Sequence, residues 1–229
     1  MIIDSRYNGP PETGNGGYCA GALAVASGLA ERGSGVGSDV VEVTLRLPPP
    51  LGVPLRVEPA DDHVGLWDGD RLVAQARPGS LAPDEVAAPV SWDEAVAASA
   101  QSPALTVSPF PTCFVCGVER ADGMRLFPGR LPGGGTAAAW TVPDEVGPEL
   151  VWAALDCPGG WATALERETY VLGRFTVGIG RLPTAGEHCV IVGSLTGEEG
   201  RKASVITTMY GGDGTRLAHA RATWISLGK

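Results

Sequence analysis

Gly14-Asn15-Gly16-Gly17-Tyr18-Cys19-Ala20-Gly21, residues 14–21, is the stretch that decides the fold. Its paired glycines and an aromatic residue open a segment that is apolar on every side to about Ala30, which is typical of a helix buried all round. A similar start, Gly159-Gly160-Trp161, occurs late in the chain and is followed by more apolar residues. The two starts predict two central helices and indicate an internal repeat.

The segments that follow the two helix starts also match in order and spacing. A β-branched strand over 40–47, a turn and a strand over 55–57 correspond to strands over 175–179 and 190–192. Each half then closes on a similar strand, Ala74-Gln75-Ala76-Arg77 in the first and Ala218-His219-Ala220-Arg221 in the second. Turn-linked strands around an apolar helix predict an antiparallel sheet that wraps it. We therefore expect an α+β fold with two antiparallel sheets, each wrapped around a central helix, as a pseudo-dimer.

The repeat divides the 229-residue chain into two modules and a connection. We expect an N-terminal module over 1–77, a linker over 78–122 and a C-terminal module over 123–229, since each module then has the size of a small domain. The linker is rich in Pro, Ala and Ser. Ser91-Trp92-Asp93-Glu94 has the spacing of a capping box and predicts a short helix there.

Composition excludes several classes of function. The formal net charge is -9 and the basic residues are scattered, which argues against a nucleic-acid partner. Five cysteines spread over a chain of this size favour a reducing, cytoplasmic setting over a disulfide framework. The apolar stretch over 18–30 is too short and too rich in glycine to cross a bilayer, so no membrane span is predicted.

Cys113-Phe114-Val115-Cys116-Gly117 has a two-residue spacing that suits half of a zinc site. A structural zinc needs four ligands, and the chain offers no second pair of this kind. Three interpretations stay open: a structural turn leading into the second module, a metal shared across an oligomer, and a redox pair. We expect no metal and no cofactor.

The run Tyr7-Asn8-Gly9-Pro10-Pro11 together with residues 14–21 resembles the start of the hotdog thioesterase-like superfamily, in which an Asn-Gly-Gly-Tyr segment leads into the central helix. Asp156, just before the second Gly-Gly-aromatic start, is similar to its counterpart in double-hotdog acyl-CoA thioesterases. The resemblance implies a double hotdog that hydrolyses or binds acyl thioesters of coenzyme A.

Two other functions stay open beside a thioester hydrolase. One is a non-catalytic hotdog protein that binds acyl thioesters or lipids, and the other is a structural pseudo-dimer in an assembly. A dehydratase on this fold needs a histidine opposite a carboxylate, and neither helix-start motif contains one. Unpaired edge strands make a homo-oligomer possible.

Helix starts are where a thioester carbonyl can be polarised, because their first N–H groups are unpaired and carry positive partial charge. This reasoning assigns substrate binding to Gly16, Gly17 and Tyr18 and to the later start, Gly159, Gly160 and Trp161. Close packing of each helix under a sheet explains the glycines equally well.

Asp156 is the first catalytic candidate, as general base or nucleophile, although an Asp before Pro158 also fits a helix cap. Asn15 is the second candidate, as a donor to the carbonyl or to water, and it equally fits a cap. In the family the carboxylate works with a Thr and a Gln from neighbouring strands. The last strand here offers Thr223, the third candidate, beside His219 and without a Gln.

Coenzyme A is strongly anionic whereas the chain is acidic, so binding requires local positive charge. We expect that charge from residues far apart in the sequence, namely Arg174, Arg181, Arg201 and Lys202.

Overall fold

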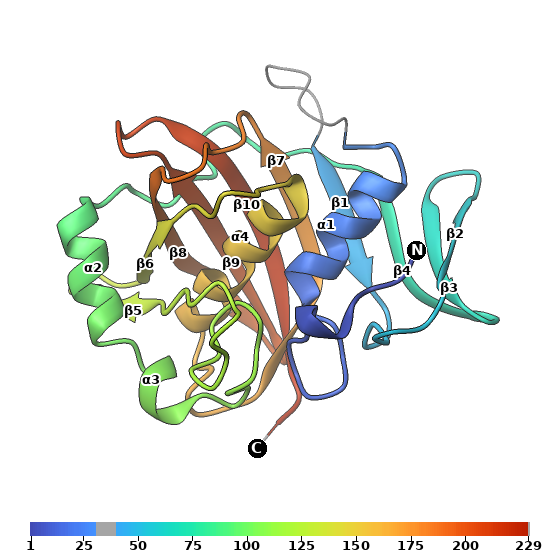
Figure 1. Cartoon of the computed structure of the whole chain (residues 1–229), viewed down its shortest axis with the longest axis horizontal. Helices are drawn as coiled ribbons and strands as arrows, with labels where there is room; N and C mark the ends of the chain where they lie inside the picture. Colours follow the sequence, from blue (N-terminus) through green and yellow to red (C-terminus); the bar gives the residue numbers. More distant parts are fainter. Residues whose placement is uncertain (31–39, 229) are drawn as a thin grey trace.

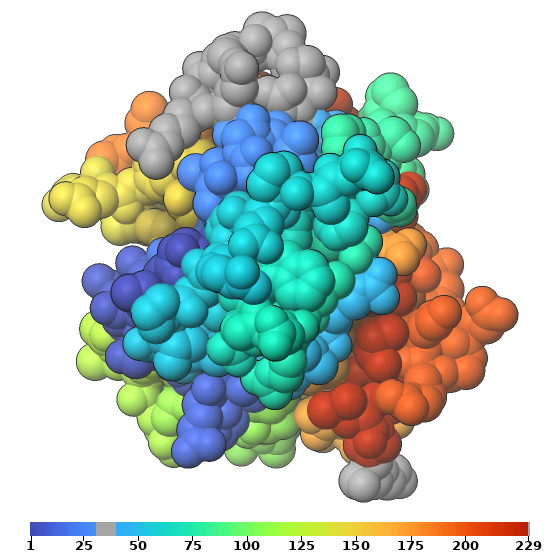
Figure 2. All heavy atoms as spheres, turned by 90° about the vertical axis from the view of Figure 1, so that its right-hand side faces the viewer, coloured from blue at the N-terminus to red at the C-terminus, as the bar shows by residue number. Residues whose placement is uncertain are grey.

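One antiparallel sheet of ten strands runs through the protein in the computed structural model, which describes residues 1–30 and 40–228. The strand order is β2-β3-β4-β1-β7-β10-β9-β8-β6-β5, and β2 to β4 form the end of the molecule seen in Figure 2. The strands are β1 (Val41–Leu45), β2 (Arg56–Pro59), β3 (Val64–Asp68), β4 (Arg71–Pro78), β5 (Gly129–Arg130), β6 (Thr136–Thr141), β7 (Tyr170–Ile179), β8 (His188–Glu199), β9 (Lys202–Tyr210) and β10 (Arg216–Ser226).

The two predicted modules share this sheet. Strand β1 of the first half pairs with β7 of the second, with Val43 opposite Phe175. The expectation of two separate sheets is therefore wrong, although the antiparallel α+β architecture is as predicted. The physical reason is that pairing the two edge strands satisfies backbone groups that each sheet alone would leave exposed.

Two helices, α1 (Gly16–Ala26) and α4 (Pro148–Ala162), lie side by side on one face of the sheet (Figure 1). Glycine makes their close approach possible, because a Cβ atom at Gly21 would lie 2.7 Å from the Cβ of Trp152. The Trp152 ring in turn packs edge-on against Phe175 of the sheet, with 5.5 Å between ring centroids. The core is thus built where the two helices meet the concave sheet.

The helix boundaries confirm one prediction and correct another. Helix α1 starts at Gly16 as expected, and it ends at Ala26, where Ser27 caps it, instead of near Ala30. Helix α4 begins at Pro148, so Pro158, Gly159 and Gly160 lie in its last turns and not at its start. The buried apolar run from Val151 to Leu155 holds the helix together, and this tertiary packing outweighs the helix-breaking tendency of Pro158.

The connection between the halves is docked against the sheet. Helix α2 (Trp92–Ala100) begins with the predicted capping box between Ser91 and Glu94. It packs on β6, where the Ala139 N–H donates to Ser99 Oγ at 3.1 Å, and α3 (Ala104–Val107) follows. A 3-10 turn, Ser5–Tyr7, precedes α1. Within the described residues, no helix is long and apolar enough to span a membrane.

Candidate functional site

The first turn of α1 meets the middle of α4 at a buried carboxylate. Asp156 is only 3% exposed, and its Oδ2 atom accepts a hydrogen bond from the Gly17 N–H at 2.9 Å. A second hydrogen bond comes from Asn15 Nδ2 at 3.1 Å. The structure thus brings Asp156 together with Asn15 and Gly17, which lie about 140 residues earlier in the chain. Asp156 is not the helix cap that the sequence left open, because it lies inside α4.

Asn15 takes the capping role that the sequence left open, and its amide group donates to Asp156. Its Oδ1 atom accepts the Tyr18 N–H at 2.8 Å and caps α1, while its amide nitrogen donates to Asp156. The segment before the helix is fixed by backbone hydrogen bonds from Asn15 N to Tyr7 O and from Gly14 N to Pro49 O, each 2.8 Å long. The position of the Asn15 side chain is therefore set by its own backbone and by the helix it starts.

A cavity of about 460 Å³ opens beside this carboxylate. Asn15, Gly16 and Asp156 lie in its wall, and most of the remaining lining is apolar, including Leu172 and Trp224. The Gly16 N–H, the first of α1, has no hydrogen-bond partner among the described residues. This space, the Asp156 cavity, therefore places an apolar chamber next to an unpaired helix N–H and a carboxylate.

Burial raises the pKa of Asp156 to about 7, against the opposing effect of the hydrogen bond from the Gly17 N–H. Negative charge on the nearby Cys113 sulfur raises this pKa further, and the hydrogen bond from the Asn15 amide lowers it. Desolvation prevails because the side chain is almost fully enclosed.

Three buried polar atoms around one turn of α4 have no hydrogen-bond partner in the described part of the chain. They are Asp156 Oδ1, Thr207 Oγ1 and Trp224 Nε1. A Cβ atom at Gly159 would lie 2.8 Å from Thr207 Oγ1 and 3.7 Å from Trp224 Nε1. Gly159 is three residues after Asp156 and therefore on the same helix face. Unpaired buried polar groups are costly, so their clustering marks a place for a polar ligand or water.

Thr207 was missed by the sequence reasoning, which looked to the last strand for the threonine that works with Asp156. The available signal was the alternation of β9, in which Ala203, Val205 and Thr207 are buried. Gly159 and Gly160 serve close packing: a Cβ atom at Gly160 would lie 2.6 Å from the Trp224 ring. Because they end α4, their N–H groups are not free helix-start donors, which corrects the role expected for them and for Trp161.

Thr223 does not join Asp156. It lies on the other face of the sheet, between its partners Arg174 and Ser204 on β7 and β9, because its neighbours Ala222 and Trp224 point into the core. There it lines a second space of about 530 Å³ that also includes Lys202, called here the Lys202 hollow. Tyr18, the remaining predicted binding residue, stacks on Tyr7 with 3.7 Å between ring centroids and is not in the wall of the Asp156 cavity.

The expected basic cluster is only partly assembled. Arg174 and Lys202 share the Lys202 hollow, and Arg174 Nε also lies 3.7 Å from Glu42 Oε1. Arg181 is paired with Glu187 at 2.8 Å, and Arg201 donates to the Ser226 carbonyl oxygen at 3.0 Å. The hollow adjoins the Asp156 cavity at its rim, since three residues line both: Leu45, Gly173 and Ile225. Arg46 adds a further positive charge at the wall of the cavity itself.

Comparison with solved structures identifies the architecture. A hotdog-fold protein of unknown function from Alicyclobacillus acidocaldarius matches over 99% of this chain and 92% of its own, with a TM-score of 0.61 and 15% identity. The chain has the hotdog fold. A proposed thioesterase from Novosphingobium aromaticivorans matches this hotdog chain over its full length and 94% of its own, with a TM-score of 0.63 and 14% identity.

A tesB protein from Mycobacterium avium subsp. paratuberculosis covers 95% of this chain and 89% of its own, with a TM-score of 0.59 and 15% identity. No family model matches the sequence of this hotdog protein. No curated protein matches it either. The structural matches confirm the predicted resemblance at the level of the hotdog fold.

Proposed function

We propose that the protein hydrolyses acyl thioesters of coenzyme A in the Asp156 cavity. The observation that carries this proposal is the meeting of an unpaired helix N–H, at Gly16, with a buried carboxylate, at Asp156, in the wall of one apolar chamber. The two helices belong to opposite halves of a pseudo-dimer in this interpretation, so one half supplies the positive helix end and the other supplies the carboxylate. The thioesterase name of the structural relative from Novosphingobium aromaticivorans supports the same reaction class.

The proposed chemistry requires little beyond positioning, because a thioester is already activated. The acyl chain occupies the apolar chamber, and the carbonyl oxygen accepts the Gly16 N–H at the positive end of α1. Water adds to the carbonyl carbon and gives a proton to the Asp156 carboxylate. The tetrahedral intermediate then collapses, the C–S bond breaks, and the coenzyme A thiolate leaves and takes up the proton from Asp156, with a carboxylic acid as the other product.

The unpaired atoms of Thr207 and Trp224 complete the proposal. The indole N–H of Trp224, in the cavity wall, is suited to hold the attacking water or the reacting carbonyl group, and the Thr207 hydroxyl lies near the same turn of α4, just outside the wall. No histidine is in the wall of the cavity in the parts of the chain that the structure describes, which supports hydrolysis over dehydration.

The anionic part of coenzyme A has a matching place outside the chamber. Arg46 lies at the cavity wall, and Arg174 and Lys202 line the Lys202 hollow, which adjoins the cavity. Glu198 and Glu199 line the same hollow, so its charge is mixed. We therefore assign phosphate recognition first to Arg46, whose guanidinium is held by Gln75 Oε1 at 3.0 Å.

A thiol-release assay tests the proposal. Purified protein is offered short, medium, long and aromatic acyl-CoAs, and at least one should release free thiol. Asp156→Asn should lower kcat by about 100-fold or more, since general-base catalysis typically contributes that much. Glu149→Gln is the matched control, because Glu149 lies in the first turn of the same helix and outside the cavity wall.

Two outcomes would refute hydrolysis. One is an Asp156→Asn variant that folds normally and keeps wild-type activity. The other is a wild-type protein that releases no thiol from any acyl-CoA yet melts at a higher temperature in its presence, which would favour the non-catalytic acyl-thioester binder.

A further inference from the structure

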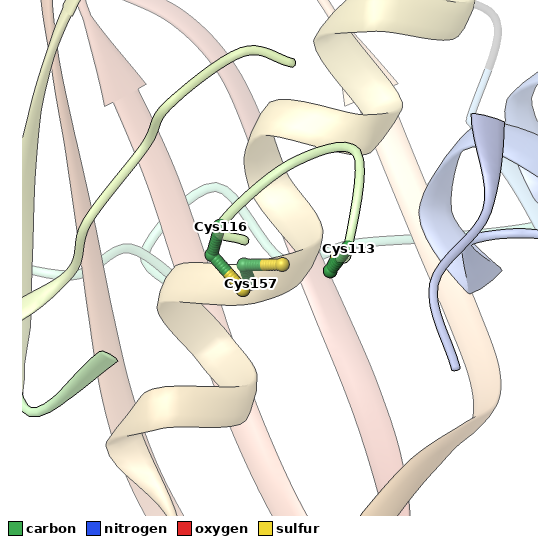
Figure 3. A group of neighbouring side chains, drawn as sticks. All are labelled: Cys113, Cys116 and Cys157. Atoms are coloured by element: carbon green, nitrogen blue, oxygen red, sulfur yellow. The ribbon is translucent and has the colours of Figure 1, made fainter. Parts of the chain in front are cut away.

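Three buried cysteines gather at the wall of the Asp156 cavity. Cys113 and Cys116 lie in the loop that follows α3, and Cys157 is carried by α4, beside that loop (Figure 3). Their sulfur atoms all lie within 4.8 Å of one another, and each residue is at most 6% exposed. The sequence showed only the Cys113–Cys116 pair; the fold supplies the third sulfur from 41 residues downstream.

We propose that Cys113, Cys116 and Cys157 bind one Zn²⁺ ion through their thiolates, with a fourth position open to the cavity and filled by water. Thiolates select soft or borderline metals such as zinc. Three thiolates bound at about 2.3 Å around a tetrahedral zinc lie roughly 3.8 Å apart, so the sulfur atoms need move by no more than about 1 Å. This revises the expectation of no metal.

The loop holds its two thiols in a fixed turn. The Gly117 N–H donates to the Cys113 carbonyl oxygen at 2.8 Å, and a Cβ atom at Gly117 would lie 2.5 Å from that oxygen, so the tight turn requires glycine. Neighbouring backbone bonds anchor it, from Phe114 N to Asn8 O at 2.8 Å and from Leu126 N to Val115 O at 2.9 Å. Because the turn is already fixed, metal binding costs less conformational entropy.

Two side-chain N–H groups point at the sulfur atoms from outside the cluster. Trp161 Nε1 donates to Cys116 Sγ at 3.5 Å, and Asn15 Nδ2 lies 3.9 Å from Cys113 Sγ. Such donors orient metal-bound thiolates and disperse their negative charge. They matter here because three thiolates and one Zn²⁺ carry a net charge of -1 in a buried place.

The protein supplies three zinc ligands, so the fourth coordination position faces the Asp156 cavity. All three cysteines line the Asp156 cavity, and no other His, Cys, Asp or Glu of the described residues joins the cluster. Three protein ligands with one open position is the arrangement that exchanges water for other ligands. Binding one Zn²⁺ releases the three thiol protons, and it involves no oxidation. The inference does not depend on the proposed hydrolysis.

The test uses the full chain, purified under reducing conditions without chelators. Metal analysis should find about one zinc per chain, and metal-free protein should bind added Zn²⁺ with release of protons. Co²⁺ in its place should give the intense near-ultraviolet band of sulfur-to-cobalt charge transfer. Cys157→Ala should weaken Zn²⁺ binding at least tenfold, whereas Cys189→Ala, a buried cysteine outside the cluster, should leave it unchanged.

Trp161→Phe provides a second variant in case Cys157→Ala fails to fold. It replaces a buried indole with a smaller aromatic ring and so removes the N–H donor at Cys116, which should weaken Zn²⁺ binding about tenfold. The proposal is overturned if wild-type protein binds no Zn²⁺, if Cys157→Ala binds it as well as wild type, or if the native protein holds two of the three thiols as a disulfide. Zinc binding without thiol release from acyl-CoA would refute only the hydrolase.

Discussion

Gly17→Ala tests how tightly the two central helices depend on each other. A Cβ atom at this position would lie 2.5 Å from the Cβ of Asp156 and 2.7 Å from the carbonyl oxygen of Trp152, where ordinary contact begins at 3.4 Å. Both neighbours belong to the buried part of α4 and neither is the end of a flexible side chain. The helices must therefore separate by up to about 1 Å, which stretches the hydrogen bond from Gly17 N to Asp156.

The expected loss of stability follows from these contacts. Overpacking a rigid core costs about 1–3 kcal/mol, and a hydrogen bond to a carboxylate contributes about 1.5–3 kcal/mol when it forms fully. The higher helix propensity of alanine offsets at most about 1 kcal/mol of this loss. The free energy of unfolding should fall by about 2–4 kcal/mol, which lowers Tm by roughly 5–15 °C for a chain of this size.

Urea unfolding and thiol release measure the two consequences. The variant should unfold at lower urea concentration and, where folded, lose at least tenfold in kcat, because the displaced Asp156 no longer faces the first N–H of α1. Gly133→Ala is the control, since nothing lies within 4 Å of a Cβ atom there. A Gly17→Ala protein with wild-type stability and activity would refute the claimed contact between the two helices.

Three further changes probe the site and its support. Arg46→Ala should raise KM about three- to tenfold for an acyl-CoA but not for the matching acyl-pantetheine, and an equal rise for both would contradict phosphate recognition. Thr207→Val should lower kcat about tenfold and leave Tm equal or higher, since it removes a buried hydroxyl that has no partner; unchanged kcat would remove Thr207 from the site. Arg181 lowers the pKa of Glu187 from 4.5 to about 2, so the ionised carboxylate stabilises the fold above pH 4.5 and this contribution is lost as the pH falls toward 2. The Tm of Glu187→Gln should therefore be lower than that of wild type at pH 7 and equal to it near pH 2. A difference in Tm that stays constant across this pH range would contradict the pairing.

Local signals allowed parts of the fold to be predicted well. Asn15 and Ser91 mark their helix starts because a cap acts within one turn of the chain, and both helices begin where these residues indicate. The alternation of β1 likewise reports which face is buried. Such features need no knowledge of distant contacts.

The start of α4 was misjudged because a local motif competed with packing. Pro158-Gly159-Gly160 looks like a helix start, yet the preceding residues are buried on all sides and continue the helix through the proline. The better signal was Gly147-Pro148-Glu149, which places proline and an acidic residue in the first turn.

The site itself depends on contacts that the sequence does not reveal. Asp156 and Asn15 were each chosen for their residue type, but their mutual hydrogen bond joins positions 141 residues apart. The same holds for Cys157 beside the Cys113 turn, and for Thr207, whose place depends on which strand faces α4. Topology brings these residues together.

A crystal structure with a ketone analogue of an acyl-CoA, in which a methylene group replaces the sulfur, tests the central claim most directly. The account predicts the ketone oxygen within hydrogen-bonding distance of Gly16 N and the ketone carbon beside Asp156 Oδ1, with the acyl chain in the apolar chamber. A ketone group bound instead in the Lys202 hollow, next to Thr223, would contradict it.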